Sequence, residues 1–446
     1  MTSMPPMTPA PHEQYTGADI PDNAYNTASW LRRHGHLDGW TLRDGEWWQW
    51  NGRAYEVRTD KNLRNYLGYL LNDPTVTGVA WSPSRAKLND VIDALVVDDV
   101  PDPESRWLPL VNGMFDPATG TLMNPTPTRF VTNYLPYEYD PDAQCPRWVQ
   151  FLESVWGDDP ESIALLQEWF GYLVSGETKL HKALLMIGPK RSGKGTIMKT
   201  ATALLGDDNT GALKPGNLGS WFGVQSVIGK SLALIDDMRL DGRLSANAQD
   251  TLLTTIAEGK QNIQRKGTGL APVDTVLRCR IMVGTNVPPV FTDPGGALPS
   301  RFMYLAMTRS FYDGAEDFDL ADELRAELSG VLNWALVGWR RLVANGYRFT
   351  VPASAAGVTE QAWEDSSPER VFFDECTREG VDEKVVCEVL YGRWVVWAKA
   401  RGHAPGSITD LGKAMKGHRP GVVRKRLNAR GFASPTPYHY VGIGVR

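Results

Sequence analysis

The chain has 446 residues, of which 42% are hydrophobic and 22% are charged. This length corresponds to about three domains at roughly 150 residues each, and the composition excludes a disordered or collagen-like chain. No apolar run approaches the roughly 18 to 20 residues that cross a bilayer, and the N-terminus lacks a basic region followed by an apolar one. We therefore expect a cytoplasmic protein without a membrane partner.

Charge is distributed unevenly along the chain. The net charge is −5, yet residues 399–446 carry ten Lys and Arg against a single Asp, whereas residues 1–150 carry 12 Lys and Arg against 19 Asp and Glu. The basic C-terminal end predicts an anionic partner there. The four cysteines form no CxxC pair, which argues against a disulfide framework and against a structural zinc site.

The N-terminal part is predicted to be a Pro-rich disordered leader, 1–25, followed by a mixed α+β region, 26–146. The stretches EWWQW and RAYEV predict two strands, and Asn51-Gly52 between them predicts a type I′ turn, which needs two positive φ values. Because aromatic residues in sheets usually fill a core, we expect the clustered tryptophans to be buried rather than to stack on bases. Gly and Pro in the following stretch, LPLVNGMFDPATGTLM, predict short strands and turns.

Helices are predicted from Arg147. Asp159-Pro160-Glu161 places a cap and a proline ahead of an apolar stripe, and Gly176 predicts the end of that helix. The next run, KALLMIG, predicts a buried strand, and TIMKTATALL predicts a helix that ends at Gly206. The runs SLALIDD and CRIMVGTN are too short for ordinary helices and predict buried parallel strands with polar residues at their carboxyl ends.

The loop between the first of these strands and its helix matches the phosphate-binding pattern GxxxxGK[ST] up to its last position. Gly188 and Gly193 would let backbone N–H groups turn toward phosphates, and Lys194 would neutralise their charge. The hydroxyl that normally follows the lysine is displaced, because Gly195 takes its place and Thr196 comes one residue later. The pattern predicts ATP binding, with Thr196 reaching Mg²⁺ indirectly through water.

The later strands supply further candidates for phosphate chemistry. SLALIDD ends in Asp236, expected to hold Mg²⁺, and Asp237, expected to polarise the attacking water. IMVGTN ends in Asn286, positioned to bond the γ-phosphate or that water between the other two motifs. Arg301, in LPSRF, offers a planar guanidinium for developing phosphoryl charge, although a surface arginine is the simpler interpretation of that residue alone.

Two basic segments are candidate DNA contacts. The stretch IAEGKQNIQRKGTGLAPVDTVLRCR predicts a hairpin with Arg265 and Lys266 where its first strand enters the loop. An exposed basic turn is the alternative. The C-terminal stretch predicts three helices and then a hairpin, which suggests a winged helix. Its third predicted helix carries basic residues that favour phosphate contact over base reading, namely Arg424, Lys425, Arg426 and Arg430.

The order of the motifs GPKRSGKGT, LALIDD, EGKQNIQRK, IMVGTN and SRF resembles the superfamily-three helicases, specifically the helicase part of phage and plasmid primase-helicases. Flanking segments extend this resemblance from about residue 105 to the end of the chain. It implies an α/β fold, with an AAA+-like parallel-sheet P-loop core at 181–350, a helical collar at 147–180 before it and a C-terminal winged helix at 367–446.

The resemblance also implies a function. It is that of a replicative DNA helicase of a phage or mobile element, a homo-hexameric ring in the host cytoplasm that uses ATP and Mg²⁺ to translocate on single-stranded DNA and unwind forked DNA. By matching position, the resemblance assigns phosphate and Mg²⁺ binding to Lys194, Thr196 and Asp236. It assigns activation of the attacking water to Asp237 and contact with the γ-phosphate to Asn286. Arg301 would be an arginine finger that acts on the nucleotide of the neighbouring subunit, and Lys266 would contact the DNA strand.

The chain departs from that family at three positions, Gly195, Asp237 where most members have Glu, and Lys260 where members often have an acid. The first two leave slow turnover open. Because only about 100 residues precede the resemblance, we expect no primer synthesis by this chain and a separate primase or replication initiator as a partner. Two alternatives stay open: an ATP-binding initiator or regulator without processive unwinding, and a small-molecule P-loop kinase.

Overall fold

The computed structural model describes residues 23–43, 45–77, 83–97, 100, 107–132, 134–236, 244–265, 272–291, 297–312, 317, 319–427 and 437–446. The chain divides into two compact units, 1–138 and 139–446. The leader predicted at 1–25 lies outside the described residues except for its last three, and the other predicted domain boundaries stay predictions. In the described ranges, no helix combines the length and the apolar character needed to cross a membrane.

The first unit is a mixed α+β structure with two small antiparallel sheets, ordered β1-β2-β3 and β4-β5-β6. Trp47 is buried among leucines of the helices, so the prediction that these tryptophans fill a core is confirmed for this residue. Trp48 and Trp50 are half-buried, and Trp48 packs edge-on against Phe130 at 5.1 Å between ring centres. The elements are α1 (Ala24–Arg33), β1 (Trp40–Arg43), β2 (Glu46–Trp50), β3 (Tyr55–Arg58), α2 (Asp60–Leu71), α3 (Pro74–Thr77), α4 (Arg85–Asp93), β4 (Leu108–Leu110), β5 (Gly113–Asp116) and β6 (Thr121–Met123).

The connection between β2 and β3 is a hairpin, but not the predicted two-residue type I′ turn. Trp50 pairs with Tyr55, so four residues form the connection. The Asn51 Oδ1 atom accepts hydrogen bonds from the N–H groups of Arg53 and Ala54, each at 2.9 Å. This side-chain turn competes with the tighter one, and in the pair Asn51-Gly52 only Gly52 has a positive φ, 96°.

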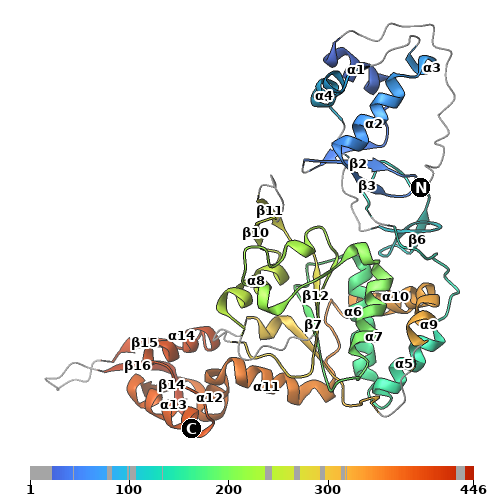
Figure 1. Ribbon diagram of the computed structural model, residues 1–446. Coiled ribbons are helices and arrows are strands. Elements are labelled where there is room, and N and C mark those ends of the chain that lie inside the picture. Colours follow the sequence, from blue (N-terminus) through green and yellow to red (C-terminus); the bar gives the residue numbers. More distant parts are fainter. Residues whose placement is uncertain are drawn as a thin grey trace. The chain divides into compact units, whose positions relative to one another are not determined.

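The second unit contains a five-stranded parallel sheet, whose strands lie in the order β13-β7-β12-β9-β8. Figure 1 labels two neighbouring strands of it, β7 and β12. Numbered along the chain this order is 5-1-4-3-2, so the strand that ends in Asn286 lies between the strand of the phosphate loop and the strand that ends in Asp236. The two runs predicted to be buried parallel strands are confirmed. The sheet strands are β7 (Ala183–Ile187), β8 (Thr210–Ala212), β9 (Leu232–Asp236), β12 (Arg280–Thr285) and β13 (Phe302–Ala306).

Helices cover both faces of this sheet. Residues of α8 (Ala246–Ile256) share one apolar cluster with alternate residues of β7, β9 and β12. On the other face, α7 (Lys194–Leu205) packs against β9 and β12, with α6 and α10 beside it (Figure 1). An antiparallel hairpin, β10 (Lys260–Ile263) and β11 (Val273–Val276), follows α8, so the hairpin predicted here is confirmed.

The helical segments before and after the sheet pack on one another. Asp159 caps α6 as predicted, because its Oδ1 accepts the Ser162 N–H at 3.1 Å, and Gly176 ends the helix with a φ of 72°. The helices are α5 (Pro146–Trp156), α6 (Pro160–Ser175), α9 (Leu320–Ala326), α10 (Leu328–Ala344) and α11 (Ala356–Ser366). Short 3₁₀ turns occur at Asp207–Asn209, Pro215–Asn217, Gln225–Val227, Pro299–Arg301 and Ala353–Ala355.

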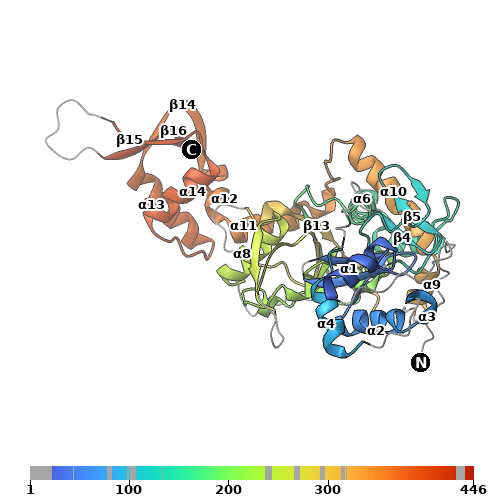
Figure 2. The ribbon, with the colours of Figure 1, turned by 90° about the horizontal axis from the view of Figure 1, so that it is seen from above.

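The C-terminal part runs in the order helix, strand, helix, helix, strand, strand, and its three strands form an antiparallel sheet ordered β14-β16-β15 (Figure 2). The third predicted helix, VVRKRLNARGF, is wrong, because its first residues form β15 and pair with β16. The elements are α12 (Pro368–Cys376), β14 (Thr377–Val386), α13 (Cys387–Ala400), α14 (Ile408–His418), β15 (Val423–Arg426) and β16 (Tyr438–Val445).

Candidate nucleotide-binding site and nucleic-acid surface

The loop from Gly188 to Gly193 turns the chain from the end of β7 into α7. Gly193 has a φ of 95°, a region that favours glycine, and no side chain caps the helix that follows. The first N–H groups of a helix can bind an anion, which the positive end of the helix dipole also attracts. A Cβ atom at Gly188 would collide with the carbonyl of Met307, so glycine is required there too.

The Lys194 ammonium group lies within this loop. It donates hydrogen bonds to the carbonyl oxygens of Gly188 at 2.8 Å and Pro189 at 2.7 Å, and to Ser192 Oγ at 3.1 Å. These three neutral acceptors hold the cation where the pattern predicts phosphate. Phosphate oxygens could replace them with charge-assisted hydrogen bonds, which are roughly twice as strong as neutral ones.

The loop is supported by the segment that follows β13 and by α5. The Met307 N–H continues the pairing of β13 with β7 by donating to Ile187 O at 2.7 Å. Ser310 Oγ then donates to Lys190 O, and the Phe311 N–H donates to Arg191 O, both at 2.9 Å. On the other side, ring atoms of Phe151 in α5 lie 3.0 Å from where a Cβ of Gly193 would be. The phosphate loop is thus held by both neighbours.

Asp236 lies across β12 from the phosphate loop. It pairs with Gly284 in the parallel ladder. A Cβ at Gly284 would lie 3.9 Å from Asp236 Oδ1, 3.8 Å from Lys194 Cβ and 3.1 Å from Met198 Sδ. Because Gly284 has no side chain, the space between the carboxylate and the lysine stem stays open. The structure therefore brings together two of the residues predicted to act on phosphate and Mg²⁺.

The other residues predicted to act at this edge of the sheet have no such close contact with Lys194 or Asp236 among the described residues. Asn286 follows β12 and is half-buried, next to a buried Thr285 whose hydroxyl donates to Val287 O at 2.7 Å. Thr196 is half-buried in the first turn of α7, and at Gly195 no atom lies within 4 Å of an added Cβ. The position of the displaced hydroxyl is thus open space. Asp237 lies outside the described residues.

The Asp236 carboxylate is of the type that proteins supply to Mg²⁺ beside phosphate, where one or two carboxylates share the metal with the ligand. Among the described residues, no group of three or more His, Cys, Asp or Glu side chains is placed to hold a metal ion. The chemistry of Asp236, beside the stem of Lys194, fits a metal that a bound phosphate also contacts.

Arg301 is not near the phosphate loop of its own chain. It directly precedes β13, which runs parallel to β7 with Phe302 opposite Ala183, so Arg301 lies at the amino edge of the sheet while the loop lies at the carboxyl edge. Five strand residues separate the two edges by about 16 Å. Beside it, Lys182 Nζ donates to Ser300 O at 2.6 Å, and burial, with the Arg301 charge, lowers the pKa of Lys182.

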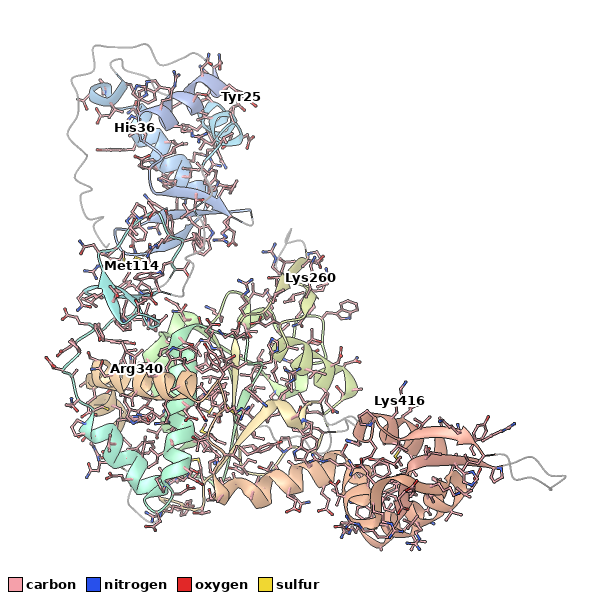
Figure 3. The ribbon with its side chains drawn as sticks, turned by 180° about the vertical axis from the view of Figure 1, so that it is seen from behind. Tyr25, His36, Met114, Lys260, Arg340 and Lys416 are labelled. Carbon is pink, nitrogen blue, oxygen red and sulfur yellow. The ribbon has the colours of Figure 1, made fainter. Side chains whose placement is uncertain are left out.

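The hairpin carries the first candidate DNA contacts. Arg265 is half-buried just after β10, and Lys266 lies outside the described residues. Lys260 is exposed at the start of β10 and lies 3.7 Å from Asp274 on the facing strand (Figure 3). The lysine that departs from the family pattern thus faces an acid across the hairpin.

Sequence reasoning missed an aromatic loop beside this hairpin. The Trp221 carbonyl accepts the Gln264 N–H at 3.2 Å, one residue before Arg265. The side chain of Trp221 is 75% exposed and that of Phe222 is 40% exposed. The signal in the sequence is GSWFG, two aromatic residues between glycines, which no helix or strand pattern claims.

The C-terminal basic residues lie on a strand. Arg424, Lys425 and Arg426 are exposed on β15, and the guanidinium groups of the two arginines lie 4.2 and 4.6 Å from the centre of the Tyr438 ring. Arg430 lies outside the described residues. Exposed lysines of α14, Lys413 and Lys416, were missed; they lie three residues apart on a helix whose buried side is apolar (Figure 3).

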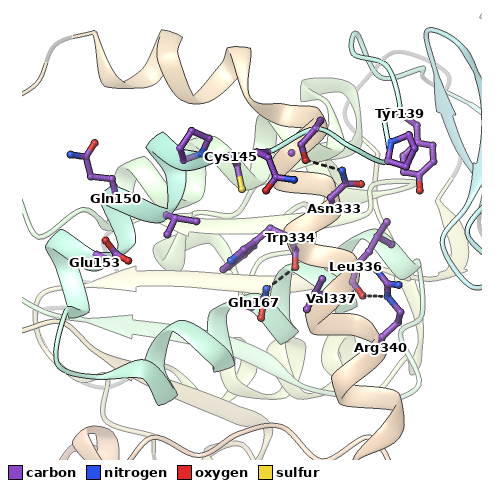
Figure 4. Close-up of a pocket in the computed structure, with 16 residues that line it drawn as sticks. Tyr139, Cys145, Gln150, Glu153, Gln167, Asn333, Trp334, Leu336, Val337 and Arg340 are labelled. Carbon is purple, nitrogen blue, oxygen red and sulfur yellow. Dashed lines mark hydrogen bonds between the residues drawn. The ribbon is translucent and has the colours of Figure 1, made fainter.

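A groove of about 1010 Å³ lies between the segment that leads into α5 and helix α10 (Figure 4). Trp334 forms part of its floor, and its carbonyl accepts a hydrogen bond from Gln167 Nε2 at 2.9 Å. Glu153 and Arg340 bring one charge of each sign to its lining. None of the residues predicted for phosphate or DNA lines this groove.

Two segments of the chain match known families. Residues 25–157 match the family described as D5 N terminal like, and residues 186–301 match a family of unknown function, DUF5906. An uncharacterised mitochondrial protein of Marchantia polymorpha, ymf21, is 25% identical over an alignment of 111 residues, which covers 22% of this chain. The chain spans 62% of the length of that relative.

The fold resembles that of the C terminal region of NrS-1. One apo structure of that region has a TM-score of 0.53 at 12% identity and covers 93% of this chain and 99% of its own. A second apo structure has a TM-score of 0.51 at 13% identity and covers 95% and 100%. At these identities the likeness concerns the fold, which the two proteins share.

Proposed function

We propose that this chain is an ATP-hydrolysing replicative DNA helicase of the superfamily-three type, encoded by a phage or mobile element. The observation that carries this proposal is the approach of Lys194 and Asp236 on either side of Gly284. A lysine in a glycine loop, with a carboxylate one strand beyond its neighbour, is the arrangement that binds nucleotide phosphates with Mg²⁺. The match to the D5 N terminal like family supports the proposal.

In this proposal the sheet is the core of an AAA+-like P-loop ATPase. The N–H groups of the loop and Lys194 bind the β- and γ-phosphates. Mg²⁺, held by Asp236 and through water by Thr196, neutralises charge that develops on the phosphate oxygens. Asp237 polarises the attacking water, and Asn286 contacts the γ-phosphate from the strand between the two motifs.

The position of Arg301 supports a ring. At about 16 Å from its own loop along the strand, it cannot reach a phosphate held there. In a ring with head-to-tail contacts, each subunit presents its amino-edge residues to the next subunit. Arg301 would then act on the nucleotide of its neighbour. We propose a head-to-tail ring on this basis, and the resemblance to the superfamily-three helicases suggests six subunits.

The DNA contacts in this proposal come from two places. Arg265 and Lys266 on the hairpin contact phosphates of the single strand, and Trp221 offers an exposed ring on which a base can stack. In this proposal the C-terminal part acts as a winged helix, which its order of helix, strand, helix, helix, strand, strand supports. Basic residues of this part then contact backbone phosphates of the forked DNA, namely Arg424, Lys425, Arg426 and Arg430.

A second candidate function is an ATP-binding initiator or regulator that does not unwind processively. The open position at Gly195 favours it, because a hydroxyl that reaches Mg²⁺ only through water is consistent with slow turnover. This candidate shares the nucleotide site and the DNA contacts with the helicase. Unwinding, rather than binding, separates the two functions.

The decisive experiment compares the full chain with Lys194→Ala in two assays, ATP hydrolysis with and without single-stranded DNA, and unwinding of a forked duplex. The helicase predicts that DNA stimulates hydrolysis, that the fork is unwound, and that Lys194→Ala loses both activities. Stimulated hydrolysis without unwinding would favour the regulator. Hydrolysis that DNA does not stimulate would contradict both candidates.

A further inference from the structure

An exposed aromatic ring lies at the rim of the phosphate loop, outside the set of residues that contact phosphate. Tyr312 follows the segment that leaves β13, and its side chain is 64% exposed. The residue before it is tied to the loop, because the Phe311 N–H donates to Arg191 O at 2.9 Å. The ring is therefore held one residue away from the phosphate loop itself.

Arg191, within the loop, backs this ring. Its guanidinium carbon lies 4.7 Å from the centre of the Tyr312 ring. Its φ is +58°, in a region that non-glycine residues seldom adopt, so the loop holds this residue in an unusual conformation. The cation stacked on one face of the ring restricts the side chain of Tyr312.

The phosphate contacts alone recognise no base. Lys194 and the loop N–H groups would hold any compound with a triphosphate, so a group that contacts the base must lie elsewhere at the rim. We propose that Tyr312, backed by Arg191, is the stacking platform for the base of the bound nucleotide, an inference that rests on the proposed ATP site. Every base has a π-face, so a platform of this kind favours purines by their larger area.

A stacking platform makes a specific prediction about which ligand it affects. Removing the ring should weaken the binding of compounds that carry a base and should leave the binding of inorganic tripolyphosphate unchanged. Stacking of one base on an aromatic side chain corresponds to about tenfold or more in affinity. Since the base takes no part in phosphate cleavage, the loss appears in the KM for ATP, with kcat retained.

The test measures binding of Mg²⁺-ATP and of Mg²⁺-tripolyphosphate by calorimetry, with the full chain and four variants, the fourth being Lys194→Ala. Tyr312→Ala is expected to lower the affinity for ATP about tenfold and to leave the affinity for tripolyphosphate unchanged. Tyr312→Phe, which keeps the ring, is expected to bind ATP within about twofold of the unaltered chain. Tyr69→Ala removes an 80% exposed tyrosine of the first unit and serves as the matched control.

The outcomes separate the platform from the ATP site beneath it. If Tyr312→Ala binds ATP as tightly as the unaltered chain, the platform proposal is wrong. It is also wrong if the variant loses affinity for ATP and for tripolyphosphate to the same extent, because the ring then only supports the loop. If the unaltered chain binds neither compound, the proposed ATPase function fails and the platform fails with it. Lys194→Ala should weaken the binding of both ligands, which would show that tripolyphosphate binds at the loop that holds Lys194.

Discussion

Gly284 lies on β12 between the carboxylate of Asp236 and the stem of Lys194, and its missing side chain lets these two groups lie on either side of one position. The sequence IMVGTN places a glycine there, but gives no reason for it. The reason appears only in the sheet, where the strand lies between β7 and β9. Glycine in a strand interior often marks such a close approach.

We predict that Gly284→Val lowers the kcat for ATP hydrolysis by at least about tenfold, because branched methyl groups would displace Asp236 or Lys194 and a shift of about 1 Å can cost a hundredfold. The variant should still fold, since valine suits a strand. Steady-state ATPase rates and a thermal melt check this. Gly284→Ala is the graded control, because its Cβ presses only on the flexible Met198 Sδ at 3.1 Å. If Gly284→Val hydrolysed ATP at an unchanged rate, the proposed nucleotide site between Lys194 and Asp236 would be wrong.

At the scale of elements, the local patterns predicted most of what surrounds the candidate site. The glycine loop between β7 and α7, the parallel strands that lead to Asp236 and Asn286, the hairpin and the cap of α6 were all readable from short stretches, because each depends on neighbours within a few residues. Contacts between distant segments were not readable in this way. Met307 lies against Gly188 and Trp221 against Gln264, and no local periodicity encodes either contact.

The error at β15 has a similar cause. Arg424, Lys425 and Arg426 are good helix formers, so their intrinsic propensity favoured a helix. Pro420-Gly421 interrupts the chain just before them, and the antiparallel pairing of Val423 with Val441 supplies the partner that turns the segment into a strand. That partner comes 18 residues later, beyond the reach of a helical window. Tertiary pairing thus decided the conformation over propensity.

The start of α5 illustrates how a distant residue stabilises an element. The cap residue, Cys145, makes no side-chain hydrogen bond to the helix. Instead, Glu327 at the start of α10 accepts the Arg147 N–H through Oε1 and the Trp148 N–H through Oε2, both at 3.0 Å. A carboxylate at this end of a helix also interacts favourably with the dipole. Glu327 therefore links the two helical segments that come before and after the five-stranded sheet in the chain.

We predict that Glu327→Ala destabilises the second unit by about 1–2 kcal/mol, the usual cost of losing an N-cap. The expected readout is a lower midpoint of the thermal transition, together with faster amide hydrogen exchange in the first turn of α5. Glu360→Ala, at an exposed glutamate of α11, is the matched control. Equal melting and exchange for the two variants would show that Glu327 does not act as the cap.

The hairpin and the loop of Trp221 form a second linked pair of elements, and they bear on DNA rather than on ATP. We predict that Trp221→Ala weakens single-stranded DNA binding by about fivefold or more, since one stacked base corresponds to about 1–3 kcal/mol. Basal ATP hydrolysis should stay unchanged. Fluorescence anisotropy with a labelled oligonucleotide measures the first and a coupled ATPase assay the second.

Trp221→Phe keeps an aromatic ring and should retain most of the DNA affinity. If Trp221→Ala bound DNA normally, the exposed ring would have no role in holding the strand. If both variants lost DNA binding equally, packing of the loop against the hairpin, rather than stacking, would be responsible. The phenylalanine variant therefore distinguishes the role of the ring from the role of the loop.

At the scale of the whole molecule, the sheet separates two groups of charged residues. Lys194 and Asp236 lie at its carboxyl edge, and Arg301 and Lys182 lie at its amino edge. In the proposed function, one chain alone would bring only the first group to a nucleotide. A head-to-tail ring would join the two groups at each subunit boundary, which makes the assembly part of the active site.

Mixing two inactive variants tests this arrangement. Arg301→Ala and Lys194→Ala should each lose ATP hydrolysis, but for different reasons, because one lacks the finger and the other lacks the phosphate lysine. In a ring assembled at random from equal amounts, roughly a quarter of the boundaries combine an intact loop with an intact finger from the next subunit. The mixture should therefore recover ATPase activity to about that fraction of the unaltered ring.

The control mixtures combine each variant with the unaltered chain, and they establish that subunits exchange and that one defective subunit does not silence a whole ring. With that established, a one-to-one mixture of the two variants that stays inactive would mean that both residues serve the same subunit. The roughly 16 Å between Arg301 and its own loop along β13 argues against that outcome. Recovery in the mixture would instead place the nucleotide at the boundary between subunits.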